Sequence, residues 1–156
     1  MLWPDTESTL AAGNIVDITK RSDIDESLDV RRDDEVYSVE PWRVVEFDTR
    51  EAAVNFREEF SEWSDIYARS LRTALPVRER PDRTSARVYR LRDGEVMKVI
   101  RRQEEESDEA GLVDYWYEVL TKEGISGWVF GYYLEPTGAS ARPLNPGDDD
   151  LEAVAR

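Results

Sequence analysis

Apolar residues recur every three or four positions in one segment of the chain, 48–70. Charged residues fill most of the positions between them. This spacing places the apolar side chains on one face of an α-helix and the charged ones on the other. The residues that define the apolar face are Ala52, Phe56, Phe60, Trp63 and Tyr67. We therefore expect an amphipathic helix here, within residues 48–71.

The same segment carries a helix start signal. Asp48 is followed three residues later by Glu51, the spacing of a capping box. The apolar face of such a helix needs an apolar surface to cover. That surface is either a sheet of the same chain or a groove of a partner protein, and the sequence leaves both open.

Apolar and polar residues alternate in short runs through the second half of the chain, as they do in β-strands. Asp93-Gly94 and Gly124 stand between such runs where tight turns are needed. The expected strands lie within residues 74–80, 86–91, 92–102, 114–121 and 126–134. Five strands in about 60 residues predict a small barrel, and the acidic segment 103–113 is long for a hairpin loop.

Several motifs in this half occur together in one order. They are the runs LPVR at 75–78, LRDGEVMKVI at 91–100, WYEVL at 116–120, and GWV and YL at 127–129 and 133–134. In order and spacing they resemble the bacterial Src-homology-3-like domain, over residues 74–136. The resemblance implies a five-stranded barrel that serves as a binding or spacing module in envelope, secreted and peptidoglycan-associated proteins. It implies no active site.

The resemblance also divides the aromatic-rich segment 116–134 into core and surface. It implies that Val119, Val129 and Leu134 fill the barrel interior, and that Gly124 and Gly127 are turn residues. The residues implied to lie on a shallow surface that can hold a peptide or glycan are Trp116, Trp128 and Tyr133. Packing alone is the other interpretation of these three rings.

One departure from the family limits the ligand. Where eukaryotic relatives carry a proline before the last strand, this chain has Phe130, and LPVRERP lacks their acidic, aromatic-rich first loop. Recognition of proline-rich helices is therefore not implied.

The two halves of the chain contain similar runs. LAAGNIVDITKR at 10–21 aligns without a gap with LRDGEVMKVIRR at 91–102, and WRVVEF at 42–47 is expected to correspond to WYEVLT at 116–121. This agreement predicts an internal repeat whose first copy is degenerate. Chance similarity of two hairpins is the alternative.

Charge narrows the class of partner. The chain has 21 Lys and Arg against 35 Asp and Glu, a net charge of −14, which repels nucleic acid. Residues 78–102 are locally basic, with nine basic and four acidic side chains. Their guanidinium groups, those of Arg78 and Arg90 among them, either hold carboxylates of a ligand or pair with acidic residues of the chain itself.

Missing residue types exclude much of enzyme chemistry. Without Cys or His, the chain lacks disulfides, thiol nucleophiles, imidazole bases and most zinc sites. The DDD run at 148–150 lacks the spacing of a calcium loop. We therefore predict no enzyme, no catalytic residue, no metal site and no cofactor. A hydrolase that uses two carboxylates is a third-ranked alternative.

These observations predict a mainly β protein. We expect a degenerate Src-homology-3-like β module at 1–47, the helix at 48–71, the barrel at 72–136, and a disordered tail rich in Pro, Gly and Ala at 137–156. The sequence contains no run of about 18 apolar residues, the length that a membrane-spanning helix needs. The resemblance favours the periplasm or cell surface, with membrane contact only through a lipoprotein anchor that is not in this chain.

The predicted function is binding of a cell-wall peptide or glycan. The candidate ligand-binding residues are Trp116, Trp128, Tyr133, Arg78 and Arg90. The alternative is a structural or protein-interaction module whose aromatic surface is covered by its own helix. The sequence does not identify the ligand, the partner or the oligomeric state.

Overall fold

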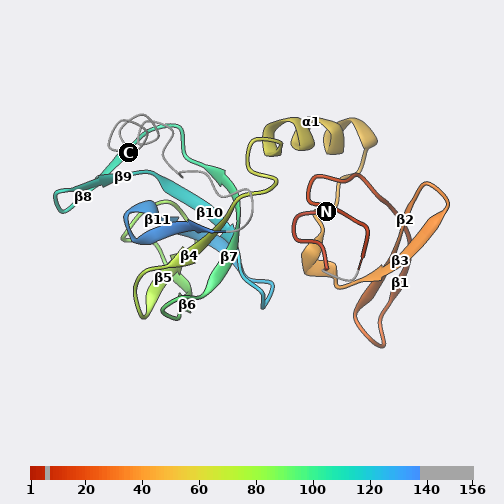
Figure 1. Ribbon diagram of the computed structural model, residues 1–156, viewed down its shortest axis with the longest axis horizontal. Helices are drawn as coiled ribbons and strands as arrows, with labels where there is room; N and C mark the ends of the chain where they lie inside the picture. The colour runs from red at the N-terminus through yellow and green to blue at the C-terminus, as the bar shows by residue number, and fades with distance from the viewer. Residues whose placement is uncertain (6–7, 138–156) are drawn as a thin grey trace. The chain divides into compact units, whose positions relative to one another are not determined.

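The computed structural model describes residues 1–5 and 8–137, and it is mainly β. The expected tail, 137–156, lies outside the described residues except for Thr137. The chain divides into two compact units, Met1–Ser64 and Asp65–Arg156, which we call the first and the second unit. Figure 1 shows the helix and the strands of both units.

The first unit contains a three-stranded antiparallel sheet in the order β1-β2-β3, followed by a 3₁₀ turn and one helix. Its elements are β1 (Asp17–Ser22), β2 (Ser27–Arg32), β3 (Glu35–Val39), η1 (Pro41–Arg43) and α1 (Arg50–Phe60). Leu10, Leu28, Val30 and Val39 form the buried core on one face of this sheet.

The helix is shorter than its apolar spacing predicts. It ends at Phe60; Trp63 lies in the following turn and Tyr67 belongs to the strand β4 (Tyr67–Ser70). The predicted Asp48 cap is also wrong, because the side chain of Thr49 accepts the Ala52 amide at 3.1 Å. Apolar spacing alone could not show the end, since the buried Trp63 and the half-buried Tyr67 continue the helical period by chance.

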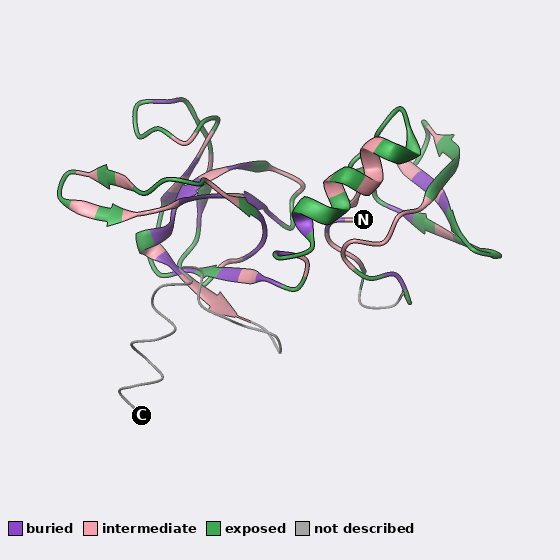
Figure 2. Cartoon of the chain, turned by 90° about the horizontal axis from the view of Figure 1, so that it is seen from above, coloured by how far each residue is buried: buried purple, intermediate pink, exposed green. Residues whose placement is uncertain are grey.

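α1 presents an apolar side to the rest of the first unit. Phe56 packs between Phe47 and Phe60. Its ring centroid lies 5.3 Å from that of Phe47 and 5.8 Å from that of Phe60. Figure 2 shows the opposite side of the helix exposed.

The second unit contains a seven-stranded antiparallel sheet in the order β12-β4-β7-β10-β11-β5-β6, with a separate hairpin, β8-β9, among the described residues. After β4 the elements are β5 (Leu75–Arg78), β6 (Arg87–Leu91), β7 (Val96–Arg102), β8 (Ser107–Glu109), β9 (Leu112–Asp114), β10 (Trp116–Leu120), β11 (Ser126–Phe130), η2 (Gly131–Tyr133) and β12 (Leu134–Thr137).

The five strands predicted for the barrel are confirmed as β5, β6, β7, β10 and β11. Strands β4 and β12 extend the same sheet beyond β7 and were not predicted. The segment expected as a long loop is also more regular than predicted, because β8 and β9 pair across a two-residue turn. Ala110 and Gly111 both have positive φ there, the geometry of a type I′ hairpin turn.

The barrel interior agrees with the predicted core. Val119 and Val129 are fully buried and Leu134 is 7% exposed. Tyr117 shares this face with Val119, because alternate residues of β10 point to the same side of the sheet. Figure 2 shows the buried stretches concentrated in these central strands.

One predicted turn residue has another role. Gly124 does lie in a turn with φ of +83°, but Gly127 lies within β11. A Cβ at Gly127 would stand 2.6 Å from the Arg78 carbonyl oxygen and 2.7 Å from Val77 Cγ1. Glycine is needed there because β11 and β5 approach closely.

The predicted correspondence of 42–47 with 116–121 is wrong. Residues 41–43 form η1 and β2 is the strand that pairs with β1, as β10 pairs with β7. The Trp-x-x-Val pattern occurs in both segments, but Trp42 lies in a 3₁₀ turn and Trp116 in a strand.

Candidate functional site

The candidate site is a cavity of about 260 Å³ in the second unit. Strands β5, β10 and β11, the β8-β9 hairpin, η2 and the segments that carry Arg72 and Arg83 supply its walls. We call it the arginine-rimmed pocket. The residues that line it are Arg72, Leu75, Pro76, Arg78, Arg83, Glu109, Ala110, Leu112, Trp116, Phe130 and Tyr133.

Aromatic rings form the floor of this pocket. Trp116 and Phe130 are opposite each other on β10 and β11, with ring centroids 5.5 Å apart. Tyr133 follows from η2, 6.5 Å from Phe130. Trp116 and Phe130 lie on the face of the strands opposite to Tyr117 and Val119, outside the barrel interior.

Trp116 is more deeply placed than the resemblance implied. It is only 3% exposed, so it is a buried floor residue and not part of a shallow surface. Its indole Nε1 donates to Glu109 Oε1 at 3.3 Å, and Ser107 Oγ donates to the same oxygen at 2.8 Å. The β8-β9 hairpin therefore orients the indole, which sequence alignment alone could not reveal.

Arginine side chains form the rim. The Arg72 guanidinium lies 4.9 Å from the centre of the Tyr133 ring, and Arg78 Nη1 donates to the Ser85 carbonyl oxygen at 2.8 Å. Arg83 Nε lies 3.9 Å from Glu109 Oε2, a long ion pair. Three arginines thus line the pocket together with one carboxylate, that of Glu109, which pairs with Arg83.

The electrostatics of the pocket favour an anion. Burial lowers the pKa of Arg78, and the nearby positive charges of Arg87 and Arg83 lower it further. Like charges held together in a partly buried place are stabilised by an added negative charge. A carboxylate is the group that guanidinium forks bind best in two-point geometry.

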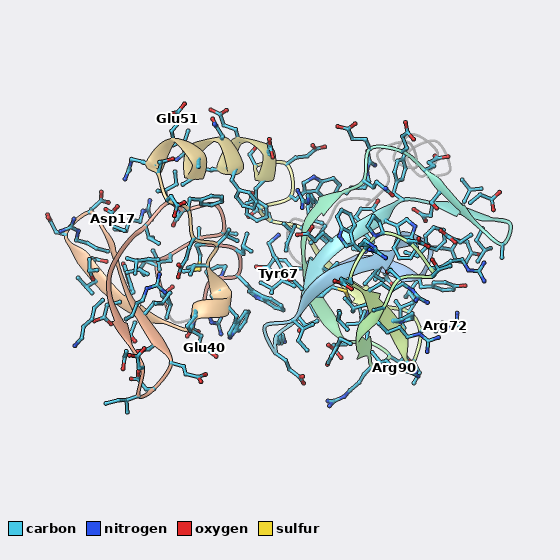
Figure 3. The ribbon with its side chains drawn as sticks, turned by 180° about the vertical axis from the view of Figure 1, so that it is seen from behind. Asp17, Glu40, Glu51, Tyr67, Arg72 and Arg90 are labelled. Carbon is cyan, nitrogen blue, oxygen red and sulfur yellow. The ribbon has the colours of Figure 1, made fainter. Side chains whose placement is uncertain are left out.

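The structure brings together three of the five predicted site residues. Trp116, Tyr133 and Arg78 line the pocket, whereas Trp128 and Arg90 are not among its lining residues. Trp128 lies further along β11, opposite Glu118 and 5.7 Å below the guanidinium of Arg101. Arg90 is exposed on β6, the last strand of the sheet (Figure 3).

Several residues that line the pocket were not predicted from the sequence. Arg72 precedes the first predicted strand, and Glu109 and Leu112 lie in the segment expected as a loop. The signal that could have found them is the Ala110-Gly111 pair, because a tight turn there folds both arms of the hairpin back over β10.

No group of three or more Asp and Glu side chains within the described residues is arranged to hold a metal ion. No helix within 1–5 and 8–137 is long and apolar enough to cross a membrane.

Family models match both units. Residues 73–135 match the model described as "Bacterial SH3 domain", and residues 1–62 match "TP0260 family, N-terminal SH3 domain". The chain therefore carries bacterial Src-homology-3 (SH3) domains, as the motifs indicated. Domains of this kind are in general non-catalytic binding modules.

A similar protein comes from Treponema pallidum (strain Nichols) and is described as "Uncharacterized protein". It is 28% identical over 153 residues, which cover 96% of this chain. The match spans 34% of the relative, so this chain corresponds to about a third of its length.

Proposed function

We propose that the second unit binds a cell-wall peptide or glycan through the arginine-rimmed pocket. The observation that carries this proposal is an aromatic floor beside three lining arginines and a single lining carboxylate. An SH3-type binding module with such a pocket fits a ligand that has a small apolar part next to a carboxylate.

The walls suggest how such a ligand is held. Trp116 and Phe130 offer ring faces to a methyl group or the apolar face of a sugar. Arg72 and Arg78 then reach a carboxylate at the rim. Stem peptides of peptidoglycan combine alanine methyl groups with free carboxylates, which is why they are the leading ligand.

The setting of the protein is part of the same proposal. We place it in the cell envelope, at the surface or in the periplasm, with any membrane attachment supplied by a lipid anchor outside this chain. We also propose that the two units are a tandem repeat of one module. The β1-β2 and β7-β10 ladders support this, since both break register once and at equivalent positions, Ile18/Lys20 and Val99/Arg101.

Co-sedimentation with purified insoluble peptidoglycan tests the proposal. We expect the native chain to pellet, and Tyr133→Ala to reduce its apparent affinity about tenfold, as loss of an aromatic contact worth roughly 1.4 kcal/mol does. Tyr132→Ala is the matched control, because Tyr132 is 51% exposed and does not line the pocket. Its affinity should stay unchanged.

A second pair of variants separates the rim from general charge. Arg83→Glu should weaken pelleting by about tenfold or more, and Arg90→Glu, the same charge change outside the pocket, should not. If the native chain stays in solution at low and moderate salt, wall binding is wrong and a protein partner takes its place. Equal losses in both arginine variants would show that the pocket is not the site.

A further inference from the structure

The ladder between β1 and β2 matches the ladder between β7 and β10 pair by pair. On β1, Asp17, Ile18, Lys20 and Arg21 pair with Arg31, Val30, Asp29 and Leu28. On β7, Lys98, Val99, Arg101 and Arg102 pair with Leu120, Val119, Glu118 and Tyr117 in the same pattern. The offset between β1 and β7 is that of the aligned runs 10–21 and 91–102, so each paired residue of β1 and β2 can be assigned a counterpart in β7 and β10.

Hydrogen bonds extend this match to the beginning of the first unit. Gly13 N donates to the Met1 carbonyl oxygen at 2.9 Å, as Gly94 N donates to that of Ser70 at 2.8 Å. The Met1 amino group donates to the Asn14 carbonyl oxygen at 3.0 Å, as Ser70 N donates to that of Glu95 at 2.9 Å. Met1 therefore takes the place of Ser70, the last residue of β4.

The chain on the other side of this position also matches. Leu2 N donates to the Arg43 carbonyl oxygen at 2.7 Å, and Leu71 N donates to that of Tyr133 at 2.9 Å. The turn η1 thus corresponds to η2, and the segment 44–47 to β12.

Strand β4 lies between β12 and β7 in the second unit. Its counterpart in the first unit would lie between the segment 44–47 and residues 15–18. That place is a cavity of about 740 Å³, which we call the strand slot. Ile15, Val16, Asp17 and Ile18 line one side of it, and Val44, Val45, Glu46 and Phe47 line the other.

The residues around the strand slot show that it lacks a covering element. Lys98, beside β4, is fully buried, whereas its counterpart Asp17 is exposed on β1 (Figure 3). Ile18, Val45 and Phe47 are 36, 39 and 38% exposed although they line a cavity. Phe56 and Phe60 of α1 form its apolar floor.

We propose that the strand slot is the acceptor site of a further β-strand. The strand that fits is an extended segment of four residues, joined to Met1 and running in the direction of β4, which adds to the edge of β1 by main-chain hydrogen bonds. Its counterparts are Ile66, Tyr67, Ala68 and Arg69. The residue in the place of Ala68, which is fully buried, should be small or apolar.

The register of β4 gives the hydrogen bond to look for. Val99 N donates to the Ile66 carbonyl oxygen at 3.1 Å. Ile18 is the counterpart of Val99, so its amide should donate to the first residue of the added strand. This inference rests on the match between the two units and is independent of the ligand of the arginine-rimmed pocket.

The test uses the full chain with four added residues. The sequence Ile-Tyr-Ala-Arg is placed directly before Met1, by cleavage from a fusion partner, and compared with Gly-Ser-Gly-Ser at the same place. We expect the β4-like extension to raise the Tm of the first unit by about 4 °C or more. We also expect it to slow hydrogen exchange of the Ile18 amide at least tenfold.

A third chain, extended by Ile-Tyr-Pro-Arg, separates strand pairing from simple apolar covering, because its proline takes the place of Ala68, whose amide faces β7. Proline lacks the amide that a ladder needs, so this chain should behave like the Gly-Ser control. If all three extensions give the same Tm and the same Ile18 exchange, the slot accepts no strand. The same Tm increase in the proline chain would overturn strand pairing, because no ladder would be needed to explain it.

Discussion

Gly131→Ala should be among the most destabilising single substitutions in the second unit, although it adds only one methyl group. An added Cβ would stand 2.4 Å from Tyr117 Cε2 and 2.8 Å from the Tyr115 carbonyl oxygen. Tyr117 is fully buried, so its ring has no space into which to retreat. We expect a loss of about 1 to 3 kcal/mol in unfolding free energy, as overpacking of a core produces.

This prediction can be checked by urea unfolding followed through NMR signals of Val119 and Val129. Gly94→Ala is the comparison, since nothing lies within 4 Å of its Cβ position and only its φ of +77° adds cost. Tyr117→Leu in the Gly131→Ala background should recover part of the loss, giving a coupling between the two sites. Strict additivity of the two substitutions would contradict the proposed clash.

Lys98→Met should stabilise the second unit at pH 6. Lys98 is fully buried, and burial lowers the pKa of its ammonium group to about 7. Its Nζ donates to the carbonyl oxygens of Ile66 and Val99 at 2.9 and 2.8 Å. Below pH 7 the folded protein must hold a buried charge that the unfolded chain exposes to water, a cost of several kcal/mol that methionine avoids.

The sign of the pH dependence follows from the same pKa. Between about pH 7 and pH 10 the unfolded chain binds a proton at Lys98 that the folded chain does not, so native stability rises with pH. The advantage of Lys98→Met should therefore be greatest below pH 7 and shrink towards pH 10. Urea unfolding at pH 6 and pH 9 measures this difference.

Lys122→Met serves as the control, because Lys122 is exposed in a turn of the same unit. It should show no such pH dependence. A Lys98→Met chain that is equally destabilised at both pH values would contradict the lowered pKa of Lys98, because a buried charge makes the substitution less unfavourable at pH 6 than at pH 9.

Most of the second unit could be predicted from its sequence. Alternation between apolar and polar residues is a local property, and it predicts all five strands expected for the barrel, while the motifs place Val119 and Val129 in the core. Pairing between strands that are distant in the chain was harder to predict. Tyr67, the first residue of β4, continues the apolar spacing of the helix in the sequence. Residues 67–70 are a strand because they pair with β7 and β12.

The candidate site was predicted in part, for a related reason. Trp116 and Tyr133 follow from the family pattern and Arg78 from the local excess of basic residues, and all three line the pocket. Arg90 belongs to the same basic stretch, 78–102, which predicts the charge but not the place of its side chain. Strand β6 instead holds it at the end of the sheet, outside the pocket. Glu109 was also hard to predict. It reaches Trp116 because the tight turn at 110–111 folds the β8-β9 hairpin, and the sequence around Glu109 alone does not show where that hairpin lies.

The first unit shows what a repeat can and cannot predict. The aligned runs did identify two strands, β1 and β7, with the same ladder and bulge. The second correspondence, between residues 42–47 and 116–121, rested on a short Trp-x-x-Val pattern and was wrong. Ladder register is therefore the more reliable guide to equivalent residues here.

The central claim is that the arginine-rimmed pocket binds the ligand, and the indole signals of two tryptophans test it most directly. Trp116 Nε1 bonds to Glu109 in the pocket, while Trp128 lies outside it on the same sheet. We would titrate the ¹⁵N-labelled chain with soluble peptidoglycan stem-peptide fragments. Our account predicts a saturable shift of the Trp116 indole signal with that of Trp128 unmoved. A shift confined to Trp128, or none at either ring, would contradict it.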